Sequence, residues 1–244
     1  MKKSLTQKLL ALILSAVVFT AFTGVTVFAE TSPSTDVDGD LSINEGAKPY
    51  IASAKDNQLV QEKLSKVNSS IRANSVSGSD NWYCILPVTV FKQTNNYYCG
   101  PATTKQVLHY INGTSLSQST YAGELGTTQN GTTMTKIDDV LNKHQTRNRY
   151  TYSEFNSYSE WEQRVQYGMI YLSPPVIDIN SQNNSHWRYT TSGHYMCISG
   201  YTTESDKTYT RVADPHYIYA GTYKYEASVV YAVNKAHWRH AIIF

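Results

Sequence analysis

The sequence predicts an α+β fold in which a helical half precedes an antiparallel β half. Between Cys99 and Val165, apolar residues recur at spacings of three and four, the period of helices packed on a core. From Pro174 onward, short β-branched and aromatic runs alternate with polar turns, which is typical of strands. Because the helices come before the strands rather than between them, the order favours α+β over a parallel α/β sheet.

Local signals place the individual elements along the chain. Pro87 marks the first strand as an edge or a bend, and Ser115 or Ser117 can cap the second helix. The predicted elements are a strand over 82–90, helices from Cys99, through 121–125, over 134–142 and near 159–165, and strands over 175–179, 194–201, 208–212, 223–225, 229–232 and 241–244.

Residues 1–29 have the pattern of a secretory signal peptide. Three early lysines give a positive start, positions 9–19 are apolar, and small residues stand at the expected cleavage positions 27–29. Threonines and a glycine dilute the second half, which favours cleavage over retention as a membrane anchor. We therefore expect a secreted, extracellular protein with no stable membrane association after the signal is removed.

Residues 30–79 differ in composition from the rest and are interpreted as a pro-region or linker. A mild helical pattern spans Leu59–Val67, and a serine-rich polar run extends from Ser69 to Ser79. The remaining residues, 80–244, suffice for one compact domain. We expect the upstream segment to add little to the domain core, so that a chain starting near Ser79 keeps its thermal stability.

The charge balance argues against a nucleic-acid partner. The net charge is +2, but 21 basic residues less the three signal lysines leave 18 against 19 acidic residues, a net charge of −1. No basic cluster then remains to attract phosphates. The chain also has 20 tyrosines, which suggest an uncharged, hydrogen-bonding surface. Separately, we expect the protein to be a monomer.

Cys99 stands where a polar loop turns into a helix. Gly100 and Pro101 suit the first turn, so the thiol sits at the positive end of the helix dipole, which favours the nucleophilic thiolate. Gln93 lies six residues upstream, close enough for its side-chain amide to face a developing oxyanion. The backbone N–H of Cys99 is the expected second donor. These features predict a catalytic nucleophile rather than a buried thiol.

A thiol nucleophile needs a base, and the base needs a group that orients it. His194 follows Gly193 at the start of a strand-like run, and Asp214 precedes Pro215 at a strand end. We predict that His194 takes the thiol proton and that Asp214 holds the imidazole in place. His216, two residues beyond Asp214, is the alternative base.

The combination of Gln93, Cys99-Gly100-Pro101-Ala102, Gly193-His194 and Asp214-Pro215 resembles the papain-like cysteine peptidases. The closer resemblance is to their double-glycine (bacteriocin-processing) peptidase-like branch, and it covers the region 80–244. It implies a papain-like fold, with the cysteine on a helical half and the histidine and aspartate on an antiparallel β half. It also implies a cysteine peptidase that acts on peptides or proteins without a cofactor.

Two other functions stay open at this point. The same triad can run amide hydrolysis or transpeptidation on cell-wall peptides, and the fold can serve a non-catalytic extracellular binding protein. Substrate profiling separates the first alternative from a general peptidase, and thiol reactivity separates the second from any enzyme.

Other chemistry-bearing residues have plain structural explanations. Cys84 and Cys197 either form a disulfide or are small buried hydrophobes. No metal is expected, because the candidate ligands have no helix-spaced metal motif. These ligands are His186, His194, Asp214 and His216. Three aromatic residues line a substrate cleft or belong to the core: Trp187, Tyr189 and Trp238.

Overall fold

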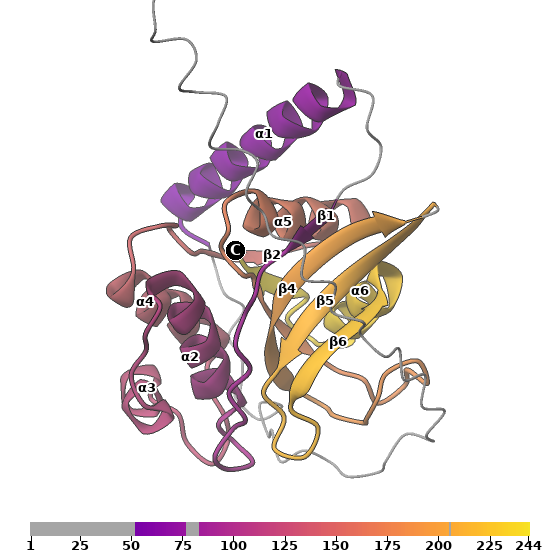
Figure 1. The fold of residues 1–244 in the computed structure, drawn as a ribbon. Coiled ribbons are helices and arrows are strands. Elements are labelled where there is room, and N and C mark those ends of the chain that lie inside the picture. Colours follow the sequence, from indigo (N-terminus) through magenta and orange to yellow (C-terminus); the bar gives the residue numbers. More distant parts are fainter. Residues whose placement is uncertain (1–51, 77–82, 205) are drawn as a thin grey trace, which may run out of the picture. The chain divides into compact units, whose positions relative to one another are not determined.

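The computed structural model describes residues 52–76, 83–204 and 206–244 (Figure 1). The chain divides into two units, Met1–Ser32 and Pro33–Phe244, and the described residues belong to the second. The predicted signal peptide therefore lies outside the described residues, as do both ends of the predicted pro-region. Within the described part of the chain, no helix is long and apolar enough to cross a membrane.

The described β part is one antiparallel sheet of seven strands. The strands are β1 (Tyr83–Ile85), β2 (Tyr152–Glu154), β3 (Val176–Ile179), β4 (His194–Glu204), β5 (Lys207–Asp214), β6 (Gly221–Glu226) and β7 (Ala241–Ile243). Their order is β2-β7-β3-β4-β5-β6, and β1 pairs with β4 off this path. Cys197 of β4 pairs with Ala213 of β5, so the first residues of β4 lie next to the last residues of β5.

The helices in the described residues are α1 (Ala54–Val76), α2 (Cys99–Asn112), α3 (Gln118–Leu125), α4 (Met134–His144), α5 (Tyr158–Ile170) and α6 (Ala227–Ala236). Helices α2, α3 and α4 pack together to one side of the sheet, and α2 also packs on β4 (Figure 1). Helix α6 packs on β3, β5 and β6. A helical group against an antiparallel sheet confirms the predicted α+β class.

The helix boundaries follow local chemistry that the sequence shows. Ser117 caps α3, because its side chain accepts a hydrogen bond from the N–H of Thr120, and Gly126 ends the helix in the left-handed region. In α4, the predicted apolar face is buried through Ile137, Val140 and Leu141. These two helices therefore form as predicted.

The predicted strand over 229–232 is wrong, because these residues lie inside α6. The adjacent β-branched residues Val229 and Val230 suggested a strand. The buried positions instead follow a helical spacing through Ala227, Val230 and Val233. The β-propensity of two valines is therefore overridden by the core contacts of one helical face.

One further strand prediction needs correction, and one strand was not predicted. The first strand ends at Ile85 instead of Val90, and only the N–H of Leu86 continues the pairing, through the carbonyl of Ser199 (2.8 Å). Pro87, which has no N–H to donate, follows at once and ends the strand. Strand β2 was not predicted, because only Tyr152 of its three residues favours a strand.

Helix α1 lies in the segment interpreted as a pro-region, yet it packs against α5 (Figure 1). Its Val60 and Val67 are buried in the hydrophobic core. The Lys63 ammonium donates to the carbonyls of Arg149 and Phe244, both at 2.5 Å, and burial lowers the pKa of Lys63 to about 7. The expectation that this segment adds little to the core is therefore wrong. The domain boundary itself stays a prediction.

Candidate active site

Cys99 is the first residue of α2, as the sequence predicts. Tyr98 precedes the helix and makes no capping hydrogen bond with its side chain. Cys99 is almost fully buried, with 1% of its surface exposed. None of the three cysteines forms a disulfide, so the alternative of a disulfide between Cys84 and Cys197 is wrong.

Tyr195 of β4 is hydrogen-bonded both to helix α2 and to the loop before α4. The Thr103 hydroxyl donates to the carbonyl of Tyr195 (3.0 Å), and the Tyr195 hydroxyl donates to the carbonyl of Thr132 (2.8 Å). Thr103 lies one helical turn after Cys99, so both residues share a face of α2. The contact therefore turns the helix face of Cys99 toward the strand residue that follows His194.

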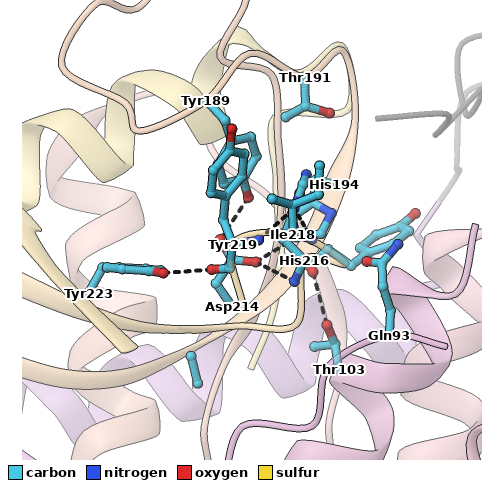
Figure 2. A network of polar contacts seen from close by, with 12 residues as sticks. Gln93, Thr103, Tyr189, Thr191, His194, Asp214, His216, Ile218, Tyr219 and Tyr223 are labelled. Carbon is cyan, nitrogen blue, oxygen red and sulfur yellow. Dashed lines mark hydrogen bonds and ion pairs between the residues drawn. The ribbon is translucent and has the colours of Figure 1, made fainter. Parts of the chain in front are cut away.

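His194 begins β4 and is fully buried. Its ring Nε2 lies 2.8 Å from Asp214 Oδ1 (Figure 2). Because an ionised carboxylate only accepts hydrogen bonds, Nε2 carries the ring proton, and Nδ1 is the nitrogen that can act as a base. The predicted pairing of His194 with Asp214 is thus present.

Asp214 ends β5 and accepts hydrogen bonds on both carboxylate oxygens. Besides His194, Oδ1 accepts from the backbone N–H of His216 (2.9 Å), and Oδ2 accepts from the hydroxyl of Tyr189 (2.7 Å). Only 1% of Asp214 is exposed, so these donors replace the water that an exposed carboxylate would have.

Gln93 is buried in the loop before α2. Its backbone N–H donates to the carbonyl of Pro215 (2.7 Å), which joins this loop to the residue after Asp214. Its side-chain Nε2 donates one hydrogen to the carbonyl of Asn95 (2.8 Å). The side-chain amide of Gln93 carries a second hydrogen that can donate to another acceptor. The oxyanion role of Gln93 stays a prediction.

His216, the alternative base, has a clear structural role. Its Nδ1 accepts hydrogen bonds from the backbone N–H groups of Ile218 (3.0 Å) and Tyr219 (3.1 Å). This nitrogen is therefore used to hold the turn between β5 and β6. Within the described residues, no group of three or more histidine, cysteine, aspartate or glutamate side chains could hold a metal ion.

Asp178 of β3 is a supporting residue that the sequence analysis missed. Its Oδ1 accepts the backbone N–H of His194 (3.1 Å), while Oδ2 lies 3.4 Å from Arg239 Nη1 and 3.3 Å from His237 Nε2. The carboxylate thus ties the first residue of β4 to the segment before β7. Burial lowers the pKa of His237, even though Asp178 opposes this effect.

Of the three aromatic residues that the sequence left between cleft and core, Trp187 and Tyr189 are buried and only Trp238 is exposed. Trp187 stacks on Tyr225 with ring centroids 4.3 Å apart, which makes it a core residue. Tyr189 belongs to the site through its hydrogen bond to Asp214. No sequence signal identified this contact, because it joins a loop residue to the end of a strand 25 residues further along the chain.

The glycine after Cys99 leads to a testable prediction about the helix start. A Cβ added at Gly100 would lie 2.7 Å from Thr132 Cβ, so Gly100→Ala forces the start of α2 away from its neighbour. We expect a loss of about 1–3 kcal/mol of stability and a clear loss of activity, measured by thermal unfolding and peptide hydrolysis.

The matched control for this substitution is Gly123→Ala. Gly123 lies in the exposed part of α3, and an added Cβ meets nothing within 4 Å. Alanine should raise stability there by up to about 1 kcal/mol, because glycine is a poor helix former. Equal behaviour of the two variants would contradict the close packing at Gly100.

A cysteine at a helix start, together with a buried histidine–aspartate pair on two neighbouring antiparallel strands, is the arrangement of the papain-like cysteine peptidases. The chain matches the model of the Peptidase_C39 like family over residues 85–241 and belongs to this family. It is therefore a cysteine peptidase with a papain-like fold, which confirms the class predicted from the sequence, and its substrates are peptides.

Two solved structures are similar to the chain. One is a double glycine motif protease from an AMS/PCAT transporter, in complex with the leader peptide, with 16% identity, a TM-score of 0.44, and coverage of 66% of this chain and 91% of that one. The other is the peptidase domain of Streptococcus ComA, with 15% identity, a TM-score of 0.41, and coverage of 63% and 94%. The comparison with curated proteins gives no significant match.

Proposed function

We propose that the protein is a secreted peptidase that cleaves peptide bonds with Cys99, His194, Asp214 and Gln93. The observation that carries this proposal is the buried hydrogen bond between His194 Nε2 and Asp214, on strands to which helix α2, which begins at Cys99, is tied by the hydrogen bond from Thr103 to Tyr195. This bond leaves Nδ1 to accept the thiol proton. The family match gives the class of reaction, and we assign the individual catalytic steps to these four side chains.

The reaction begins when His194 Nδ1 takes the proton of the Cys99 thiol and the thiolate attacks the carbonyl carbon of the substrate. The negative charge moves to the carbonyl oxygen, where the Cys99 N–H and the Gln93 amide donate hydrogen bonds. His194 then gives its proton to the leaving amine, and a thioester forms on Cys99. Water, deprotonated by His194, hydrolyses the thioester and restores the thiol.

Asp214 keeps the imidazole in one tautomer and stabilises the imidazolium during these steps. The hydrogen bonds from the Tyr189 hydroxyl and from the N–H of His216 hold the carboxylate in its buried position. Secretion through residues 1–29 places the reaction outside the cell. The family match favours an enzyme over the non-catalytic binding protein.

The proposed function is tested with a broad peptide library, incubated with the mature protein and with the Cys99→Ala variant. Cleavage by the wild type alone, read by mass spectrometry, supports the peptidase. Products in which one peptide is joined to another amine would instead support the transpeptidase alternative. Cleavage by both proteins would refute Cys99 as the nucleophile.

A further inference from the structure

Tyr189 lies in the loop between β3 and β4, and hydrogen bonds join the two ends of this loop. The N–H of Ser181 donates to the carbonyl of Thr191 (2.9 Å), and the Ser181 hydroxyl accepts from the N–H of Thr191 (3.0 Å). The same hydroxyl donates to the carbonyl of Tyr189 (2.7 Å). The backbone of Tyr189 is thus fixed relative to both ends of the loop, at β3 and at β4.

The ring of Tyr189 is held between three neighbouring rings. It is parallel to the ring of Tyr219, with centroids 5.4 Å apart, and 4.3 Å from the ring of His216. It meets the imidazole of His194 edge to face at 5.8 Å and 88°. With 1% of its surface exposed, Tyr189 has little freedom to turn, so its hydroxyl has a fixed direction.

That hydroxyl donates to Oδ2 of Asp214 at 2.7 Å, on the carboxylate oxygen that does not face His194 (Figure 2). A carboxylate held through one oxygen can still rotate about its bond to Cβ, because this torsion has broad minima. Donors on both oxygens remove that freedom. The plane of the carboxylate then sets the direction of the hydrogen bond to the imidazole.

We propose that Tyr189 is a positioning residue for the thiol chemistry: it holds the Asp214 carboxylate so that the His194 imidazole stays aligned with Cys99. This inference rests on the proposed roles of Cys99, His194 and Asp214. The oriented hydroxyl distinguishes this role from packing, because phenylalanine would fill the same space with the same ring.

The test is the alkylation of Cys99 by iodoacetamide at about pH 6 and at about pH 9.5, read by peptide mass spectrometry in wild type and Tyr189→Phe. At about pH 6, thiolate forms only with help from an aligned imidazole, whereas at about pH 9.5 most of an unassisted thiol is ionised. We expect Tyr189→Phe to slow alkylation at the lower pH about fivefold or more and to leave the rate at the higher pH within about twofold.

Two controls separate positioning from loss of structure. Cys197 is fully buried, and burial raises its pKa to about 12, so its labelling reports unfolding and should stay absent in the folded variants. Tyr150→Phe removes another buried hydroxyl, which donates to the carbonyl of Pro174 (3.2 Å), and should change neither rate.

The outcomes are distinct. An unchanged rate at the lower pH in Tyr189→Phe overturns the positioning role while the proposed function stands. An equal fall at both pH values, or labelling of Cys197, assigns the effect to structure and also overturns it. A wild-type Cys99 that reacts only at the higher pH removes the proposed function, and this inference with it.

Discussion

Replacing Cys99 by serine is expected to lower turnover of a library-derived peptide substrate at least about a thousandfold, because the hydroxyl cannot be deprotonated by an imidazole arranged for a thiol. The change is nearly isosteric at a buried position, so the fold should persist. Initial rates under saturating substrate, together with a thermal unfolding curve, measure both quantities.

Cys84→Ser is the matched control for this variant. Cys84 lies on β1, is half-buried, and its thiol contacts the carbonyl of Met169 (3.6 Å), which a serine hydroxyl can also reach as a donor. Burial raises the pKa of Cys84, so this thiol is less nucleophilic than an exposed one. Its loss should leave turnover within about twofold. A Cys99→Ser variant as active as the Cys84→Ser variant would contradict the assignment.

Removing α1 is expected to cause the largest loss of stability. A chain that begins near Ser79 loses the buried side chains of Val60 and Val67, each contributing about 1.5–3 kcal/mol. It also loses the Lys63 ammonium, which leaves the carbonyls of Arg149 and Phe244 without this donor. The sum of about 4 kcal/mol or more corresponds to a fall of about 10 °C or more in Tm.

A chain that begins at Ala52 keeps all of α1 and serves as the control, and the chain that begins near Ser79 should melt about 10 °C or more below it. Scanning calorimetry of the two truncated chains gives the comparison. If the shorter chain melts at the same temperature, α1 is a separable segment and its packing contributes nothing measurable.

Much of the fold could be predicted because its elements carry local signals. The apolar spacing after Cys99 and the cap at Ser117 both depend on residues only three or four positions apart, so they can be recognised in the sequence. Helix α6 could not be predicted, because the β-branched pair Val229–Val230 fits a strand equally well until its neighbours in the core are known. The packing of α1 was missed for the same reason, since its stabilising contacts lie far along the chain.

The candidate site divides in the same way. Cys99, His194 and Asp214 could be proposed because each stands in a short, recognisable setting, and the structure shows the hydrogen bond between His194 and Asp214. Tyr189 and Asp178 were missed, because their importance arises from the antiparallel register that brings β3, β4 and β5 together. A single sequence does not specify that register.

The central claim is that the imidazole of His194 activates the thiol of Cys99. The most direct measurement is the ultraviolet absorbance of the thiolate as a function of pH, taken as the difference between wild type and Cys99→Ser, and repeated in the His194→Ala background. An activated pair keeps Cys99 ionised at about pH 6 in wild type, and His194→Ala moves the ionisation up to about pH 8.5. Ionisation near pH 8.5 in both backgrounds would contradict the account.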